Sequence, residues 1–208
     1  MVWNAAVLEG NTHTLSQVRT LASGVTVGGM RVAEFRQIVA LIRAHERLGE
    51  MVAAGTFRLE KATSDELHKI VGRYEAPDAG RFRGEGSAVG GGDVRLSDGS
   101  TVKGTPPGPG GANLHERFED MLAYVGELPD PRMQALVYAA AAARAQFYFD
   151  GNKRSARLMA TGLLMSNGFD AVSVPATRRL EFNHALDTLF TTDDATVLMS
   201  FLASCTID

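Results

Sequence analysis

The chain has little of what disulfide-stapled or membrane-spanning proteins need. It contains one cysteine, Cys205, among 208 residues. A single cysteine excludes an internal disulfide framework and is typical of proteins in a reducing cytosol. The longest apolar stretch, 135–143, ends at Arg144 and is too short to cross a bilayer. No cationic segment followed by a long apolar run opens the sequence, so no signal peptide is predicted. We therefore expect a cytoplasmic protein.

An excess of either charge is also missing. The chain has 21 lysines and arginines against 24 aspartates and glutamates, for a net charge of −3. This balance gives no electrostatic reason to expect nucleic acid or a membrane surface as partner. No internal repeat, zinc-ligand spacing or Walker-type loop is present. The hydrophobic content of 45% is enough for one good core.

Apolar residues recur mostly at helical spacing, which predicts a mainly α fold. We expect an N-terminal helical segment over 1–55 and a core domain over 56–208. Between the helices, Val94 and Leu96 alternate with Arg95 and Ser97, and Asp98-Gly99 follows. This pattern predicts a β-hairpin with a two-residue turn. The predicted helices are 15–22, 32–54, 64–74, 112–125, 132–145, 153–167, 177–189 and 193–204.

The segment 146–157, Gln-Phe-Tyr-Phe-Asp-Gly-Asn-Lys-Arg-Ser-Ala-Arg, predicts a phosphate site. It places three cations, Lys153, Arg154 and Arg157, in the first turns of a predicted helix. Cations there oppose the helix dipole, so the arrangement costs stability until an anion arrives at the free backbone N–H groups. Taken alone, the same letters could also form an ordinary surface turn before a helix.

This segment resembles the active-site loop of the Fic family, His-x-Phe-x-(Asp/Glu)-Gly-Asn-(Gly/Lys)-Arg-x-x-Arg. Gln146 stands at the histidine position and Tyr148 at the phenylalanine position. The resemblance implies the Fic fold, a helical bundle with a β-hairpin flap beside the active-site loop. It also implies a relation to enzymes that transfer AMP from ATP to a Ser, Thr or Tyr hydroxyl on a protein. The residues in register are Asp150, Gly151, Asn152, Lys153, Arg154 and Arg157.

Two further segments match that family in the right order. Glu9-Gly10-Asn11 resembles its N-terminal inhibitory motif, with Ala5 at the usual Ser/Thr position, and implies that Glu9 pairs with Arg157. The same letters also fit a plain helix C-terminus capped by glycine, and both interpretations can hold together. The predicted hairpin stands where the family has its flap, so Val94, Arg95 and Leu96 would dock a target protein as an added strand. An ordinary surface hairpin is the alternative.

The resemblance also assigns roles within the loop. Asp150 would hold Mg²⁺ together with the phosphates of ATP. Gly151 and Asn152 would cradle a phosphate, and Arg154 and Arg157 would neutralise the β- and γ-phosphates. Lys153 would add a point charge, as in the related Doc toxins, which phosphorylate their target.

Gln146 departs from the family at its general base. A glutamine amide cannot take a proton from a hydroxyl at physiological pH, and losing a general base costs about 10²–10⁴ in rate. His13 is the nearest substitute by sequence, although an exposed surface histidine is its ordinary interpretation, and Tyr148 titrates too high to act as a base. His68 is expected to be structural.

Three functions stay open at this point. The chain is a nucleotide-binding protein impaired in AMP transfer, an active transferase with an unusual base or phosphate-containing substrate, or a protein-binding pseudoenzyme. A homodimer is a further assembly consistent with the family.

Overall fold

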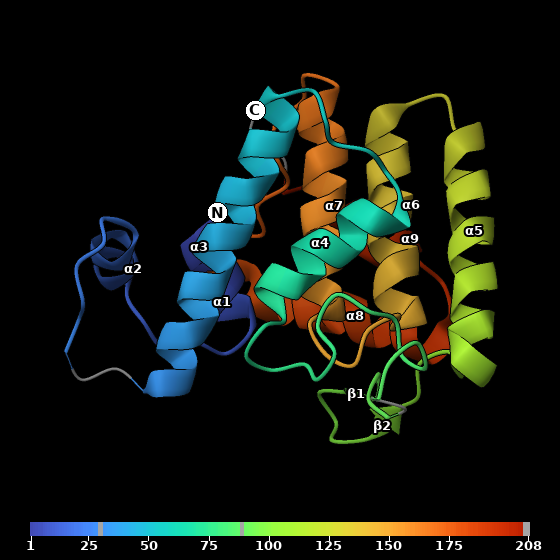
Figure 1. Cartoon of the computed structure of the whole chain (residues 1–208), viewed down its shortest axis with the longest axis horizontal. Helices are drawn as coiled ribbons and strands as arrows, with labels where there is room; N and C mark the ends of the chain where they lie inside the picture. Colours follow the sequence, from blue (N-terminus) through green and yellow to red (C-terminus); the bar gives the residue numbers. More distant parts are fainter. Residues whose placement is uncertain (29–30, 88–89, 206–208) are drawn as a thin grey trace.

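The computed structural model describes residues 1–28, 31–87 and 90–205 and is mainly helical, as predicted (Figure 1). The only strands in this part of the chain form one short hairpin. None of its helices is long and apolar enough to cross a membrane. The elements are α1 (Val2–Leu8), α2 (Leu15–Ala22), α3 (Val32–Ala53), α4 (Lys61–Val71), β1 (Val94–Arg95), β2 (Thr101–Val102), η1 (Pro109–Gly111), α5 (Ala112–Glu127), α6 (Pro131–Ala145), α7 (Asn152–Ser166), η2 (Ala176–Arg178), α8 (Arg179–Thr192) and α9 (Thr196–Ala203).

Capping residues explain where several helices begin. Thr14 and Gln17 form a reciprocal capping box that starts α2. Asp130 caps α6, whose first position is a proline. The left-handed backbone of Asp193 (φ 58°) ends α8 at Thr192, so the last helix begins at 196 and not at the predicted 193.

The predicted start of α4 was wrong. Ser64 was expected to begin this helix, but α4 already starts at Lys61 and Ser64 lies one turn inside it. The Ser64 side chain is buried and its hydroxyl bonds to that of Tyr148 at 2.8 Å. Ser64 therefore belongs to a buried polar contact, which the sequence pattern does not distinguish from an N-cap.

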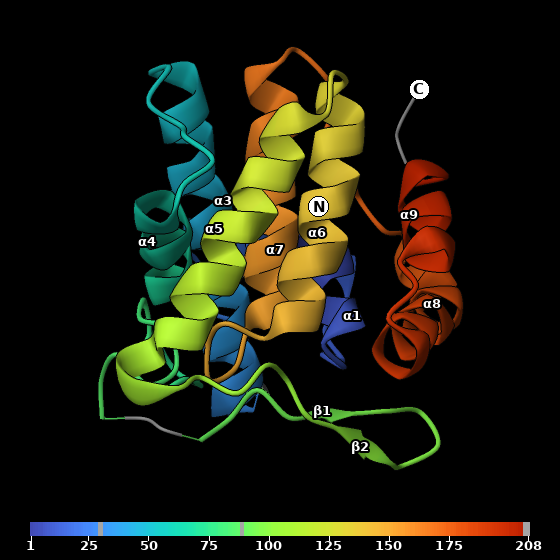
Figure 2. The ribbon, with the colours of Figure 1, turned by 90° about the vertical axis from the view of Figure 1, so that its right-hand side faces the viewer.

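The helices α6 and α7 form the centre of the bundle (Figure 2). α6 is rich in alanine, and its small side chains let α7 approach closely. On the other side of α7, Gly162 faces the ring of Phe57 so closely that an added Cβ would lie 2.3 Å from it. Around this pair, α3 and α4 pack against α7, whereas α5 and α9 pack against α6.

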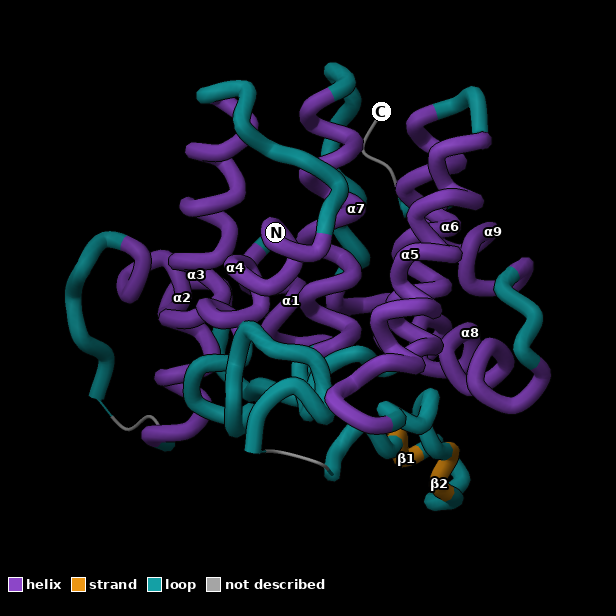
Figure 3. Tube along the Cα trace, turned by 45° about the vertical axis from the view of Figure 1, so that its right-hand side comes forward, coloured by secondary structure: helices purple, strands orange, loops and turns teal. Residues whose placement is uncertain are grey.

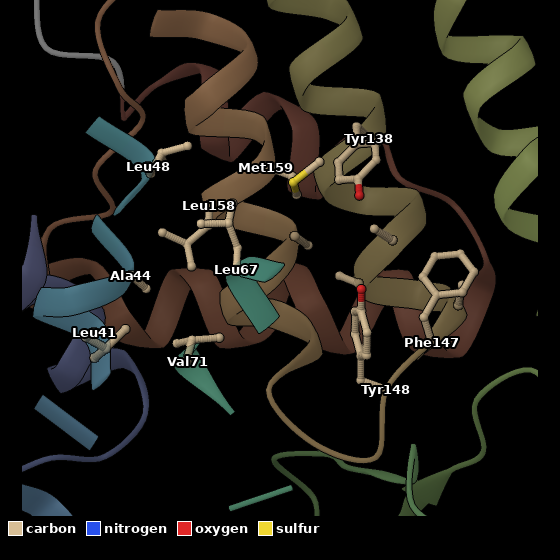
Figure 4. Close-up of a cluster of buried hydrophobic side chains, with 14 of the residues drawn as sticks. Leu41, Ala44, Leu48, Leu67, Val71, Tyr138, Phe147, Tyr148, Leu158 and Met159 are labelled. Atoms are coloured by element: carbon tan, nitrogen blue, oxygen red, sulfur yellow. The ribbon is translucent and has the colours of Figure 1, made fainter. Parts of the chain in front are cut away.

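Two hydrophobic clusters fill the interior. The first joins α3, α4, α6 and α7, and Figure 4 shows Leu41, Leu67 and Met159 converging there with Tyr148. The second lies among α6, α8 and α9 and includes Val94 and Leu96 of the hairpin. The first cluster takes residues from both sides of position 55, so the predicted division there stays a prediction and coincides with no boundary between the two cores.

The hairpin alternates as predicted, but its turn differs. Val94 and Leu96 are buried, whereas Arg95 and Ser97 are exposed. Val94 pairs with Val102, and the Leu96 N–H donates to the Ser100 carbonyl at 2.9 Å. The turn between Leu96 and Ser100 therefore has three residues, whereas a two-residue turn was predicted. Gly99 takes the positive φ of 86° that such a turn with a glycine bulge requires.

Several connecting loops lie at one end of the bundle, whereas those between α3 and α4 and between α5 and α6 lie at the opposite end (Figure 3). The loop between α6 and α7 lies at the first of these ends together with the hairpin, and the segment before the hairpin runs alongside them. Any site formed by the predicted motifs must therefore lie at this end.

Candidate functional site

The loop between α6 and α7 is closed on itself by Asn152. Its side-chain oxygen accepts from the Tyr148 N–H at 2.7 Å, and its amide donates to the Tyr148 carbonyl at 2.8 Å and to Gln146 Oε1 at 2.9 Å. Gln146, in the left-handed region (φ 54°), ends α6 and donates to the Ala143 carbonyl at 2.6 Å. Both side chains are buried and occupied within the loop. The main chain is then what the loop can offer to a ligand.

His68 of α4 holds the far side of this loop. The Gly80 N–H donates to its Nδ1 and its Nε2 donates to the Asp150 carbonyl, both at 2.8 Å. The ring stacks on Tyr148 at a centroid distance of 3.7 Å. Burial lowers the pKa of His68 to about 4, so the ring stays neutral. The predicted structural role of His68 is confirmed.

Tyr148 is likewise a packing residue. It is 2% exposed, and its hydroxyl donates to Asp65 at 2.8 Å. Burial raises its pKa well above the ordinary value, with the charge of Asp65 adding to the shift. Tyr148 is therefore no substitute for the missing base.

The first turn of α7 presents free donors. Gly151 takes a positive φ of 77° at the N-cap position, and no side chain caps the helix. The first main-chain bond returns from the Ser155 N–H to Gly151. Within the described residues, the N–H groups of Asn152, Lys153 and Arg154 have no acceptor, which is the arrangement that binds anions at a helix N-terminus.

Glu9 reaches this turn from the end of α1. Its Oε1 accepts from Arg157 Nη2 at 3.1 Å, and its Oε2 lies 3.6 Å from Arg154 Nε. Burial alone would raise the pKa of Glu9, but the charges of Arg154, Arg157 and Lys153 outweigh it and lower the pKa. Glu9 is also the C-cap of α1, with Gly10 at φ 85°. The expected contact with Arg157 and the helix C-terminus are both present.

Arg154 is held by a second carboxylate that the sequence did not reveal. Its Nη1 pairs with Glu75, whose other oxygen accepts from Gln37 at 3.0 Å. Asp150 lies 3.6 Å from Nη2, and the Arg154 side chain is only 3% exposed. Burial would lower the pKa of Arg154, but the three neighbouring carboxylates raise it. No local pattern marks Glu75, because only the fold brings it to α7.

A cleft of about 410 Å³ opens beside this cluster. It is bounded by the end of α1, the start of α7, the hairpin and α8. Arg179, another residue that the sequence analysis missed, contributes a cation from α8. The Ser97 N–H donates to Asp187 at 3.2 Å and joins the hairpin to α8. The residues that line the cleft include Glu9, Gly10, Val94, Arg95, Leu96, Lys153, Arg179, Asn183 and Asp187.

Asp150 is the carboxylate available to a cation. Its side chain is 56% exposed, and one oxygen accepts from the Gly151 N–H. No group of three His, Cys, Asp or Glu side chains in the described residues could hold a metal by itself. A magnesium ion that uses one carboxylate plus phosphate oxygens and water fits this donor set.

Arg83 connects the loop to both ends of the hairpin. Its guanidinium donates to the carbonyls of Gln146 at 2.8 Å, Gly91 at 3.3 Å and Thr105 at 2.6 Å. The side chain is 5% exposed, and burial lowers its pKa. The sequence analysis assigned no role to Arg83.

His13 does not have the exposed position expected for it. It is 7% exposed, and its Nδ1 lies 2.6 Å from the Asn11 side-chain oxygen and 3.8 Å from Glu34. His13 is thus a buried part of the segment that follows Glu9.

Comparisons with known proteins find relatives along almost the whole chain. Protein adenylyltransferase Fic of Drosophila willistoni is 31% identical over 212 residues, covering 99% of this chain and 39% of the relative. The Drosophila grimshawi protein of that name is 29% identical, with 99% and 40% covered. The chain thus spans about two fifths of the length of these curated relatives. No protein-family model matches it.

Solved structures share the fold. A Fic family protein from Desulfovibrio desulfuricans superposes with a TM-score of 0.79 at 18% identity, over 98% of this chain and 60% of the other. Fic-1 from C. elegans gives 0.75 at 23% identity, over 98% and 59%. The loop, the hairpin and the glutamate at the end of α1 lie in one place, and the alignments with these curated relatives cover 99% of the chain, which belongs to the Fic family.

Proposed function

We propose that this chain binds Mg²⁺-ATP in the cleft beside α7 and that its transfer of AMP to protein hydroxyls is impaired. The named relatives are protein adenylyltransferases, which makes ATP the first nucleotide to consider. The observation that carries the proposal is the pairing of Glu9 with Arg157 beside an uncapped helix N-terminus.

Binding is supported by the donors and cations that face one space. The N–H groups of the first turn of α7 would receive a phosphate, and Lys153 and Arg179 line the same cleft. Arg157 would reach a terminal phosphate through its planar guanidinium once Glu9 leaves it. Asp150 would hold the magnesium ion, which supplies charge neutralisation to the phosphates when bound.

Impairment is supported by the state of Gln146. Its amide has no proton equilibrium near neutral pH, and both of its polar ends are already bonded inside the loop. Loss of a general base removes about 10²–10⁴ in rate, roughly 3–5 kcal/mol of barrier. Positioning and electrostatics alone would leave slow transfer.

Protein docking at the flap belongs to the same proposal. Each strand of the hairpin has one neighbour, so a strand edge is available for main-chain pairing with a target segment. Val94 and Leu96 anchor the flap in the second core and Arg95 stays exposed. The target would therefore meet the main chain and Arg95 more than the two apolar side chains.

Calorimetry with Mg²⁺-ATP tests the binding and the Glu9 contact together. We expect Glu9→Gln, which keeps the shape and removes the charge, to tighten binding by about tenfold or more, equivalent to ~1.4 kcal/mol. Glu46→Gln, an exposed carboxylate on α3, is the matched control and should bind as the natural chain does. Absence of heat in all three proteins would contradict a nucleotide site.

Labelled ATP tests the missing base. The natural chain should give little labelled product, whereas Gln146→His combined with Glu9→Gln should give more, and Asp150→Ala in that background should abolish it. Strong turnover by the natural chain that Asp150→Ala abolishes would instead establish an active transferase with an unusual base.

A further inference from the structure

A second cavity, of about 680 Å³, lies between α3 and α4 and shares none of its lining residues with the cleft beside α7. Its walls are two facing helical stripes. On α3, Val39, Ala40 and Arg43 follow Arg36 at spacings that put all four on one face. The residues that line it are Val39, Ala40, Arg43, Lys69, Ile70, Arg73, Tyr74, Ala76, Asp78 and Ala79. We call this the α3–α4 groove.

Like charges gather at the rims of the α3–α4 groove. The guanidinium carbons of Arg36 and Arg73 lie 5.4 and 5.6 Å from the centre of the Tyr74 ring, which is 44% exposed. Each arginine is attracted to the face of the ring, but the two like charges repel each other, and an anion bound beside them would relieve that repulsion. Arg43 and Lys69 add two more exposed cations.

None of the four cations forms an ion pair with a carboxylate in the described part of the chain. Glu75, next to Tyr74, turns to Arg154 and Gln37. Asp78 accepts from the hydroxyl of Ser87 at 2.8 Å. The rims therefore carry a local positive field in a chain whose net charge is −3.

The floor of the groove is apolar. Ala40 and Ala76 are buried, and Val39 and Ile70 are half-buried along the centre. A free phosphate or a nucleic-acid backbone would use the rims and leave this floor unused. Proteins that bind single-stranded nucleic acid stack its bases on several aromatic side chains, and the lining of the groove has one aromatic ring. An occupant that fits must carry apolar side chains between acidic ones.

A helix satisfies this requirement better than an extended segment. The α3–α4 groove is walled by two helices and offers no strand edge, so an extended peptide would gain no main-chain pairing there. A helix satisfies its own backbone and presents an apolar stripe with charged flanks. We propose that the α3–α4 groove docks an acidic amphipathic helix of a partner protein, with its apolar stripe on the floor and its carboxylates on the four cations. This goes beyond the nucleotide site and does not rest on it.

Selection from a displayed random peptide library on the immobilised chain tests the proposal. We expect enriched peptides that place leucine or other apolar residues at helical spacing between glutamates and aspartates. An enriched peptide that carries a fluorescent label should bind the natural chain in solution. The double variant Arg43→Glu with Arg73→Glu should bind it at least tenfold more weakly, as measured by fluorescence anisotropy. Tyr74→Ala, which keeps the four cations, should also weaken this binding.

The matched control reverses two exposed arginines elsewhere, Arg19→Glu with Arg117→Glu, and should leave the affinity unchanged. Circular dichroism melting confirms that all variants fold. Equal binding by both double variants, or enriched peptides that lack acidic residues, would overturn the proposal. Tighter binding of a single-stranded oligonucleotide at the same salt would assign the groove to nucleic acid instead. Dimerisation of the natural chain that the groove variant abolishes would assign it to a second copy.

Discussion

At the scale of single residues, His68 shows how a buried neutral ring fixes a functional loop. Both of its nitrogens are used, one as acceptor from Gly80 and one as donor to Asp150. Protonation would put a hydrogen on Nδ1, which would then face the Gly80 N–H as a second donor, and this bond would be lost. The lowered pKa is therefore a property of the fold with a measurable consequence.

Acid should destabilise the protein through His68. Its pKa falls from 6.5 to about 4 on folding, so the unfolded state binds more protons between those values and stability rises with pH there. The contribution is fully present above pH 6.5 and is lost as pH falls toward 4, by roughly 3 kcal/mol. Urea unfolding at several pH values should show this slope reduced in His68→Gln. The exposed-histidine control His184→Gln should keep it, and an equal slope in all three proteins would contradict the assignment.

Gln146 and Asn152 should behave as one energetic unit. Each substitution to alanine removes bonds within the loop, and we expect each to cost about 1–2 kcal/mol of unfolding free energy. Because Asn152 donates to Gln146 Oε1, the double variant should cost less than the sum by at least ~0.5 kcal/mol. Denaturant titration of the four proteins of the cycle measures this. Strict additivity would show that the contact carries no energy.

The residues that sequence reasoning could and could not find differ in one physical respect. Glu9, Asp150 and Arg157 lie in short local patterns, so the resemblance to the family's motifs marks them. Glu75 and Arg83 act through contacts made between distant segments, and their neighbours in sequence form no pattern. Burial of His13 was missed for the same reason.

At the scale of elements, two helical glycines allow the effect of packing on stability to be distinguished from the effect of helix propensity. Gly162 in α7 and Gly49 in α3 both lie inside helices, where alanine is preferred by about 1 kcal/mol. A Cβ at Gly162 would lie 2.3 Å from the Phe57 ring, whereas one at Gly49 meets nothing within 4 Å. The same substitution should therefore have opposite effects.

We expect Gly162→Ala to destabilise the chain by about 1–3 kcal/mol through overpacking. Gly49→Ala should stabilise it by ~0.5–1 kcal/mol. Thermal melts followed by circular dichroism compare them directly. A stabilising Gly162→Ala would mean that Phe57 moves aside at little cost and that α7 is less tightly packed than the structure indicates.

Most helices were predictable here and their ends were not, and α1 was not among the predicted helices. Apolar periodicity located the predicted helices, because most have one clearly buried face. The start of α4 was misplaced because Ser64 is chemically a good cap but is used in the core. The hairpin turn was misjudged because Asp98-Gly99 suits both a two-residue turn and the glycine-bulge turn that is present.

At the scale of the whole molecule, α1 is part of the main core. Ala6 is 1% exposed within the first cluster, and Trp3 packs against it while its Nε1 donates to the His13 carbonyl at 2.9 Å. The predicted division at residue 55 stays a prediction, and α1 to α3 share this cluster with the later helices. The periodicity of apolar residues cannot predict that these helices share one cluster, because it shows which face of a helix is buried and not which other helix covers it.

The single tryptophan allows this to be tested. If α1 unfolds together with the bundle, the fluorescence of Trp3 and the far-UV circular dichroism should change at the same urea concentration. Glu9→Gln should bring the fluorescence transition to lower urea than the circular dichroism transition, because α1 then loses its ion pairs with α7. Coincident transitions in that variant would show that apolar packing alone holds α1.

The three carbonyls gripped by Arg83 have a mechanical consequence. The guanidinium fixes the chain before and after the flap, and the Gly104 N–H donates to the Gly92 carbonyl at 3.1 Å across the same two roots. The base of the flap is therefore fixed, and only the part of the hairpin beyond these contacts is free to tilt. The third carbonyl is that of Gln146, so one side chain joins the flap to the end of α6. If a target strand docks on the flap as proposed, we expect this contact to couple docking to the geometry of the loop without movement of any helix.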